Sequence, residues 1–388
     1  YYIKNNKIQT NIFLINVKNY FKNLLNLFSF FSLDQNYKNF VFYSEGENYR
    51  NYFIDIIEVL IKNYNVKITY VSSEKKDIID NASVKNIFIG NGTIRTIFFS
   101  ILKCKNFIMT LTDLDNLYLK KSKLCEKYIY FFHSGISTHI GYTKKAFWNY
   151  DIIFCNGNYH IQELTAVENY YNIKKKKLLK SGYPYLDFVE KKNTKKNSTK
   201  IKNILLAPTW INKKNNLFED YSIELIDNLI KKEYSVTLRP HPEHFKISSE
   251  SIKIINNRFK KFENFTLEKN ISNLESLYES DLLITDYSGI SLEYILALKK
   301  PVIFVNSAKK INNEEHSKIE LDSIENNLRN YFGYQLDAEN LDKIAELIYT
   351  IEINGIPRKN ELQEFLNKNF YNQGRAAEKI AGEIFKLL

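Results

Sequence analysis

The chain has 388 residues, of which 44% are hydrophobic and 26% charged, and its 55 Lys and Arg against 44 Asp and Glu give a net charge of +11. This length exceeds what one hydrophobic core usually supports, so two domains are expected. No apolar stretch reaches the roughly eighteen residues that a membrane-spanning helix needs, which predicts a soluble or peripheral protein.

The positive charge is partly concentrated in lysine-rich runs at residues 174–177 and 191–200. A basic surface attracts phosphate-rich partners, such as nucleic acid, anionic lipid and phosphorylated polymers. The alternative is an Asn-, Lys- and Ile-rich composition that spreads lysine over a solvated surface without a partner. The three cysteines, Cys104, Cys125 and Cys155, lack the spacing of a zinc site or a disulfide framework, which favours a reducing cytoplasm.

Residues 1–36 are predicted to form an amphipathic helical segment. Between Asn11 and Leu33, apolar residues recur at intervals of three to four, and Lys18 and Lys22 lie on another face. The apolar positions are Leu14, Val17, Phe21, Leu24, Leu25, Phe28 and Phe31. Such a helix suits the interface of an anionic membrane, although docking on the protein's own core would produce the same pattern.

Residues 37–190 alternate short β-branched and aromatic runs with helical stretches, which is typical of a parallel sheet covered by helices. The predicted strands are Phe40–Tyr43, Val66–Val71, Ile87–Ile89, Phe107–Thr110, Tyr128–Phe132 and Ile152–Cys155. The predicted helices are Tyr52–Lys62 and Ile94–Leu102.

The polar, lysine-rich residues 191–200 are predicted to be a linker, after which the alternation restarts over residues 201–388. Strands are predicted at Asn203–Ala207, Ser235–Leu238, Leu282–Thr285 and Pro301–Val305, and helices at Tyr221–Lys232, Asn273–Glu279 and Ser288–Leu298. The pattern predicts an α/β fold with two Rossmann-like domains whose parallel sheets face across a cleft. The last helix is a candidate to cross back to the first domain.

Three predicted strands end in polar residues at the edge where ligands bind in such folds. The first ends in Thr285 and Asp286, and Ser288 is predicted to cap a helix whose N–H groups, with those of Gly289, hold a pyrophosphate. The alternative is that Asp286 and Ser288 only cap a structural helix.

The second predicted strand end carries Arg239, His241 and His244 among prolines. Arg239 is a candidate bidentate phosphate ligand, and His241 could donate a hydrogen bond to a phosphate oxygen as its charge develops. Pro208 and Thr209 follow another strand of the same domain and are assigned to the same binding edge.

The third strand end carries His133, Ser134 and Gly135. We expect His133 to project into the cleft as a general base for an acceptor hydroxyl, and Gly135 to allow close approach of the backbone. His139 is a weaker candidate because its loop is expected to be exposed. Asp113, in an Asp-x-Asp stretch, is assigned to the acceptor side of the cleft. No metal site or cofactor is expected, although a divalent metal is left open.

Six segments occur in an order that resembles the CDP-glycerol glycerophosphotransferase family, the teichoic-acid-type polyol-phosphate transferases. They are His-Ser-Gly at 133–135, Gly-Tyr-Pro-x-x-Asp at 182–187, Ala-Pro-Thr-Trp at 207–210, Arg-Pro-His-Pro at 239–242, Thr-Asp-Tyr-Ser at 285–288, and residues 369–375. The resemblance implies a GT-B-type fold, a CDP-glycerol-like donor bound mainly by the second domain, and His133 and His241 as the functional histidines.

The resemblance further implies transfer of a polyol phosphate to a polymer or lipid-linked acceptor, with release of CMP, by an enzyme on the cytoplasmic face of the membrane. The chain departs from the family pattern at Ser134 and Ile136, at Gly289 in place of a second Ser, and at Tyr185 in place of an Arg after the proline. These departures leave the polyol and the nucleotide open.

Two other functions fit parts of the sequence. A nucleotide-sugar glycosyltransferase for capsule or lipopolysaccharide synthesis would use the same fold. A basic nucleic-acid-binding protein would use the charge of +11, but no motif of that class occurs, so nucleic acid is not expected as a partner.

Overall fold

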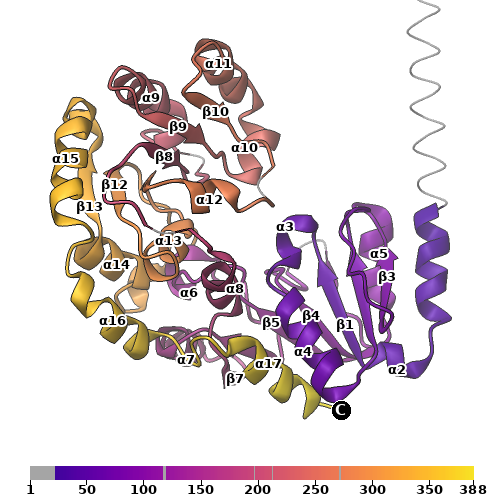
Figure 1. Cartoon of the computed structure of the whole chain (residues 1–388). Coiled ribbons are helices and arrows are strands. Elements are labelled where there is room, and N and C mark those ends of the chain that lie inside the picture. Colours follow the sequence, from indigo (N-terminus) through magenta and orange to yellow (C-terminus); the bar gives the residue numbers. More distant parts are fainter. Residues whose placement is uncertain (1–21, 117–118, 196, 212, 271) are drawn as a thin grey trace, which may run out of the picture.

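The computed structural model describes residues 22–116, 119–195, 197–211, 213–270 and 272–388 (Figure 1). Within these residues the chain forms two parallel β-sheets, one of seven strands and one of six. Each sheet is covered by helices on both faces, because its strands are apolar on both sides. We call them the N-terminal and the C-terminal unit.

The N-terminal sheet has the strand order β3-β2-β1-β4-β5-β6-β7. Its strands are β1 (Phe40–Ser44), β2 (Ile68–Ser72), β3 (Val84–Phe88), β4 (Cys104–Met109), β5 (Cys125–Phe131), β6 (Ile152–Cys155) and β7 (Lys177–Lys180). The helices are α2 (Gln35–Lys38), α3 (Glu47–Arg50), α4 (Ile54–Tyr64), α5 (Thr93–Ile101), α6 (Thr138–Gly141), α7 (Asn158–Tyr170) and α8 (Pro184–Lys192).

The C-terminal sheet has the order β10-β9-β8-β11-β12-β13. Its strands are β8 (Asn203–Leu206), β9 (Ser235–Leu238), β10 (Phe265–Leu267), β11 (Leu282–Thr285), β12 (Val302–Asn306) and β13 (Tyr334–Asp337). The α-helices are α9 (Ser222–Ile230), α10 (Pro242–Ile247), α11 (Ser249–Phe259), α12 (Glu275–Glu279), α13 (Ile290–Leu296), α14 (Ile324–Phe332), α15 (Ile344–Asn354), α16 (Leu362–Asn369) and α17 (Ala376–Phe385). The remaining helical turns are the π-helix η1 (Leu217–Tyr221) and the 3₁₀-helices η2 (His316–Lys318), η3 (Ala338–Lys343) and η4 (Lys359–Glu361).

In both sheets the strand order reverses beside a central strand. The reversal lies between β1 and β4 in the N-terminal sheet and between β8 and β11 in the C-terminal sheet. In open α/β sheets, ligands bind outside the carboxyl ends of the strands at such a reversal. The predicted fold class, with two Rossmann-like parallel sheets, is confirmed.

The predicted N-terminal helix lies partly outside the described residues, which begin at residue 22. Residues 22–31 are helical. Leu27 and Phe30 are buried in the core beneath α5, whereas Leu25 and Phe28 are 67% and 61% exposed. This part of the helix therefore docks on the protein's own core with one face and presents two apolar side chains on another.

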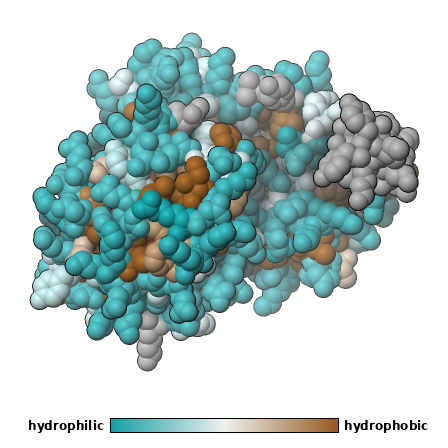
Figure 2. Space-filling view, turned by 90° about the horizontal axis from the view of Figure 1, so that it is seen from above, coloured by the Kyte–Doolittle hydropathy of each residue, from teal (hydrophilic) through white to brown (hydrophobic). Residues whose placement is uncertain are grey.

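The face of the molecule shown in Figure 2 is mostly hydrophilic, and its apolar residues gather in a few patches. Among the described residues, no helix combines the length and the apolar character that crossing a bilayer requires. All three cysteines are buried thiols, and Cys104 and Cys125 lie opposite each other on β4 and β5 with their Sγ atoms 3.5 Å apart.

The C-terminal end of the chain returns to the N-terminal unit, where α17 lies beside α4 (Figure 1). Ile380 and Ile384 are buried in the same core as Ile57 and Leu60. The chain therefore crosses between the two units near residue 200 and again before α17.

Residues 369–375 dock on the N-terminal unit through close backbone contacts. A Cβ atom on Gly157 would lie 1.6 Å from the carbonyl oxygen of Asn369. A Cβ atom on Gly182, whose φ is +93°, would lie 2.3 Å from the carbonyl oxygen of Tyr371. Only glycine fits at these two positions, so two of the six family-like segments hold each other together.

The carboxylate of Asp187 caps α17 from the other unit. It accepts hydrogen bonds of 2.9 Å from the backbone N–H groups of Gly374 and Ala376, and no side chain of the helix's own end provides a cap. Two otherwise unpaired N–H groups at a helix start are thereby satisfied.

Asp187→Ala should destabilise the docking of α17, because the backbone N–H groups of Gly374 and of the buried Ala376 would lose their acceptor. The expected cost is about 0.5–2 kcal/mol, the range for loss of a helix cap, seen as a lower Tm and faster hydrogen exchange in α17. Glu190→Ala is the matched control, since Glu190 is exposed on the same helix and forms only a surface ion pair with Lys299. Equal effects of the two substitutions would contradict the capping role.

Candidate functional site

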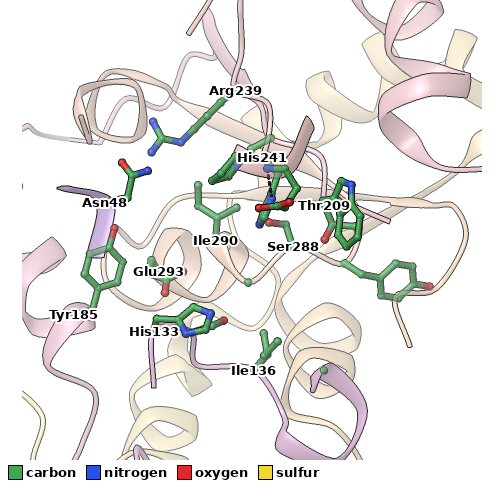
Figure 3. A pocket seen from close by; sticks show the side chains of 18 of the residues that line it. Asn48, His133, Ile136, Tyr185, Thr209, Arg239, His241, Ser288, Ile290 and Glu293 are labelled. Carbon is green, nitrogen blue, oxygen red and sulfur yellow. Dashed lines mark hydrogen bonds between the residues drawn. The ribbon is translucent and has the colours of Figure 1, made fainter. Parts of the chain in front are cut away.

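A cavity of about 560 Å³ lies between the two units (Figure 3). Its walls are formed by segments that follow β1, β4, β5 and β7 of the N-terminal sheet and by segments that follow β8, β9, β10, β11 and β12 of the C-terminal sheet. The cavity therefore occupies the edge at which both sheets end their strands, beside the reversals of strand order.

The structure brings most of the sequence-predicted site residues to this cavity. Those that line it are His133, Ser134, Pro208, Thr209, Arg239, His241, Ser288 and Gly289. Those that lie outside its lining are Asp113, Gly135, His244, Thr285 and Asp286.

His133 enters the cavity from the end of β5 and is surrounded by aromatic rings. Its ring centroid lies 5.8 Å from that of Tyr49, 6.3 Å from that of Tyr52 and 6.1 Å from that of Tyr142, all in edge-on contact. Burial, with a smaller contribution from the positive charge of Lys310, lowers the pKa of His133 to about 4. The ring is therefore neutral at pH 7 and is able to accept a proton.

His241 lines the cavity from the start of α10, where it also caps the helix. Its Nδ1 accepts a hydrogen bond from the N–H of Glu243 at 3.2 Å, and its own N–H donates to Nδ1 of His244 at 3.1 Å. Burial lowers the pKa of His241 to about 3, so the ring is neutral. Because Nδ1 is an acceptor, the proton must lie on Nε2, which leaves Nε2–H as a hydrogen-bond donor.

His244 has a structural role instead of the predicted role in donor binding. Its ring is 2% exposed, stacks on Phe218 with the centroids 3.9 Å apart, and completes the cap of α10 through His241. The sequence placed it correctly beside the site, but the helix turn directs its side chain into the core.

Arg239 lines the cavity but is also tied to the protein. Its Nη1 donates to Oε2 of Glu268 at 2.7 Å and to the carbonyl oxygen of Asn273 at 2.9 Å. Glu268 therefore offsets much of the charge that this guanidinium would offer to a phosphate.

Thr285 and Asp286 brace the loops that form the donor side of the cavity. Asp286 Oδ1 accepts from the N–H of Thr209 at 2.8 Å, and Thr285 Oγ1 donates to the carbonyl oxygen of Ala207 at 2.6 Å. Burial raises the pKa of Asp286 to about 6, and the bond from Thr209 opposes this shift. These side chains hold the ends of β8 and β11 in register rather than facing the cavity.

The helix after β11 begins later than predicted. It starts at Ile290, with Gly289 at its N-cap position and no side-chain cap, so the predicted N-cap role of Ser288 is wrong. Ser288 and Gly289 nevertheless line the cavity.

Three of the departures from the family pattern, Ser134, Ile136 and Gly289, meet each other at the contact between the units. A Cβ atom on Gly289 would lie 2.5 Å from Oγ of Ser134 and 3.2 Å from Cγ2 of Ile136. Gly135 packs beside them, and a Cβ atom there would lie 3.2 Å from the ring of Tyr183. A second serine at 289 would crowd Ser134, so these substitutions are sterically matched.

Asp113 forms a loop brace outside the cavity lining, although its neighbour Thr112 lines the cavity. Its carboxylate accepts hydrogen bonds from the hydroxyl groups of Thr143 and Thr112. Within the described ranges, no group of three or more His, Cys, Asp or Glu side chains is arranged to hold a metal ion.

The structure adds site residues that sequence reasoning missed, including Tyr49, Tyr52, Glu293 and Lys310. Glu293 is 4% exposed; its Oε1 accepts from the Tyr183 hydroxyl at 2.6 Å, and burial raises its pKa to about 7. The rule that led to His133 could have found these residues too, because each of them follows the end of a predicted strand by no more than nine residues.

A buried pair in the N-terminal unit, His139 and Glu163, contacts the C-terminal unit through His139. His139 Nδ1 lies 3.4 Å from Oε1 of Glu163, and its Nε2 lies 3.0 Å from the carbonyl oxygen of Leu321 in the other unit. His139 is 2% exposed, so the expectation of an exposed loop is wrong. A carbonyl only accepts, so Nε2 carries a proton, and a second proton on Nδ1 allows pairing with Glu163.

This pair predicts a pH-dependent stability. Burial disfavours the charged form of His139, but the interaction with Glu163 outweighs burial and raises the pKa of His139. Burial also disfavours the charged form of Glu163, but His139 and neighbouring groups outweigh burial and hold the pKa of Glu163 below its usual range. The contribution of His139 to the free energy of unfolding is fully present below the pKa of the unfolded state, about 6.5, and is lost as pH rises through the raised pKa of the folded state. The Glu163 contribution is present above about pH 4.3 and is lost at lower pH.

We expect His139→Gln to lower Tm most between about pH 5 and 6.5, and the difference from the unchanged protein to shrink as pH rises. Loss of one partner from a buried pair costs about 3–5 kcal/mol. Thermal melts of both proteins across this range measure the difference. A difference that is independent of pH would show that His139 is not charged in the folded state.

The comparisons with known proteins agree with this geometry. Two Rossmann-like units around a shared cavity define a protein of the GT-B type. A family model described as CDP-glycerol:poly(glycerophosphate) glycerophosphotransferase matches residues 25–386. The chain therefore belongs to this family.

Two curated relatives have related names. The chain is 34% identical over 149 residues to the teichoic acid poly(glycerol phosphate) polymerase of Bacillus spizizenii and 27% identical over 203 residues to the teichoic acid glycerol-phosphate primase of Bacillus subtilis. These matches cover 34% and 47% of this chain and 35% and 46% of the relatives. The matched segments thus span less than half the length of either relative.

Solved structures share the fold over almost the whole chain. The wall teichoic acid polymerase TagF superposes with a TM-score of 0.60 at 16% identity, covering 98% of this chain and 97% of that chain. The UDP-GlcNAc 2-epimerase of Neisseria meningitidis superposes with a TM-score of 0.55 at 13% identity, covering 90% and 100%. At these identities the likeness defines the fold alone.

Proposed function

We propose that the chain transfers glycerol phosphate, or a related polyol phosphate, from a CDP-activated donor to a hydroxyl of a teichoic-acid-like or capsular acceptor, with release of CMP. The observation that carries the proposal is that His133 and His241, contributed by different units, line one cavity in a member of this family. The acceptor is a polymer or a lipid-linked chain.

In the proposed reaction, the acceptor hydroxyl oxygen forms a bond to the phosphorus of the glycerol phosphate, and the bond from that phosphorus to the bridging oxygen breaks. The hydroxyl proton passes to neutral His133, and the electron pair of the broken bond leaves on CMP. Nε2–H of His241 donates to the phosphate oxygens as their charge develops, and the cavity holds both reactants together.

The donor is proposed to bind on the C-terminal side of the cavity. Pro208, Thr209, Ser288 and Gly289 border the reversal of strand order between β8 and β11, where a nucleotide binds in folds of this type. The brace from Asp286 to Thr209 fixes these loops before the donor arrives.

A panel of nucleotide donors tests the proposal. CDP-glycerol, CDP-ribitol, UDP-glucose and UDP-GlcNAc would each be incubated with the protein and a poly(glycerol phosphate) acceptor. CMP release that depends on the acceptor supports the proposal. Release of UDP from a sugar donor, with no CMP from either CDP-polyol, would contradict the proposal and indicate a nucleotide-sugar glycosyltransferase instead.

We also propose that the protein works at the inner face of the cytoplasmic membrane, held there by its N-terminal segment. Leu25 and Phe28 are exposed on adjacent turns of the described part of that helix. Leu25→Asp with Phe28→Asp should reduce sedimentation with anionic vesicles at low salt. Unchanged sedimentation would refute this role of the two side chains.

A further inference from the structure

The loop after β12 extends from the C-terminal unit across to the N-terminal unit, and it carries Lys310 to the cavity. Two residues later, the backbone N–H of Asn312 donates a hydrogen bond to the carbonyl oxygen of Ile140 at 3.0 Å. The side-chain amide of Asn312 donates a second hydrogen bond to the carbonyl oxygen of Gly141 at 2.7 Å. These bonds anchor the loop to α6, so Lys310 is held where the two units meet.

Lys310 differs from the other charged groups of the cavity in having no protein partner. Among the described residues it forms no hydrogen bond and no ion pair, although it is half-buried in the cavity wall. Arg239, by contrast, is paired with Glu268, and Glu243 with Lys246. A half-buried ammonium without a partner loses part of its hydration, and an anion bound beside it would offset that loss.

The charge of Lys310 acts on groups from both units. After burial, it contributes to the lowered pKa of His133 at the end of β5 and to that of His241 at the start of α10. Burial also lowers the pKa of Lys310 itself, which Asp286 and Glu325 oppose. Lys310 also lines the same cavity as both histidines that the proposed reaction uses.

We propose that Lys310 binds the phosphate groups of the activated donor, between His133 and His241, and that it supplies positive charge where negative charge develops as the leaving nucleotide departs. This assignment rests on the proposed function. It adds a cation that no family-like segment of the sequence contains, contributed by a loop that both units hold in place. An ammonium is well suited to this role, because its three N–H groups adapt to a phosphate that moves during transfer.

Binding measurements on the full chain test the assignment independently of turnover. Lys310→Met should weaken the binding of CDP and of inorganic pyrophosphate by about tenfold to a hundredfold, the range for a charged hydrogen bond, and leave cytidine binding unchanged. Lys309→Met is the matched control, because Lys309 is exposed beside it and does not line the cavity. Lys310→Arg keeps the charge and should recover part of the affinity.

The pH dependence of transfer provides a second readout. Without the charge of Lys310, the pKa of His133 should rise, so the acid limb of the rate profile should move to higher pH in Lys310→Met and not in Lys309→Met. Unchanged affinity for pyrophosphate in Lys310→Met, or an equal loss of cytidine binding, would overturn the proposal. If the unchanged protein binds pyrophosphate more tightly than Lys310→Met does, but does not bind CDP, the result would contradict the proposed cytidine nucleotide and would still support phosphate binding by Lys310.

Discussion

His133→Ala is expected to lower the rate of transfer by about a hundredfold to ten-thousandfold, with donor affinity near that of the unchanged protein. The lowered pKa of His133 keeps its imidazole neutral on the N-terminal side of the cavity, and the rings of Tyr49, Tyr52 and Tyr142 fix its orientation. A group that accepts the acceptor's proton contributes to the transition state and little to binding of the donor. Rate measurements with calorimetric titration of CDP-glycerol separate the two effects.

His160 provides the contrast for this experiment. It is also a buried histidine whose pKa burial lowers to about 4, but its Nε2 lies 2.9 Å from the carbonyl oxygen of Ile136 and it does not line the cavity. His160→Ala should lower Tm and affect turnover only through stability. A large fall in Tm and lost donor binding in His133→Ala would instead assign His133 a structural role.

His241→Asn is expected to lower turnover by about a hundredfold to a thousandfold, the usual cost of removing one hydrogen-bond donor to a developing negative charge. Asparagine is among the best N-cap residues, so it can replace the acceptor that Nδ1 provides to Glu243. It is too short to replace Nε2–H in the cavity. The substitution therefore separates the cap from the catalytic hydrogen bond, and Tm should change little.

His241→Ala removes both roles and should lower Tm as well as turnover. If His241→Asn were as active as the unchanged protein, the contribution of His241 would be confined to capping α10. Measurement of kcat and Tm for the two variants together decides between these outcomes.

Central strands were predicted from sequence more completely than edge strands. Strands β1 and β11 were predicted correctly because they are runs of mostly apolar residues, and the structure buries every residue of both strands. The missed strands, β7, β10 and β13, lie at sheet edges and keep exposed polar residues. Helix α7 was missed because it buries His160 and Glu163, which interrupt the apolar period.

The position of the site was predictable, whereas the partners of each side chain were not. Polar residues after a strand end gather at one edge, so His133, His241 and Thr209 were placed together correctly. The same residue types also cap helices and brace loops, as His244 and Asp286 do here. Whether such a residue lines the cavity or caps a helix depends on the direction in which the turn points its side chain. This direction is set by contacts with residues that are distant in sequence.

The central claim is that the cavity between the two units binds a CDP-activated donor with its phosphates between His133 and His241. The most direct test is a crystal structure of His133→Ala soaked with CDP-glycerol, in which slow transfer should preserve the donor. We expect the cytidine on the C-terminal wall near Thr209 and Ser288, with the glycerol phosphate directed towards position 133. A donor bound outside this cavity, or in it with the nucleotide on the N-terminal wall, would contradict the account.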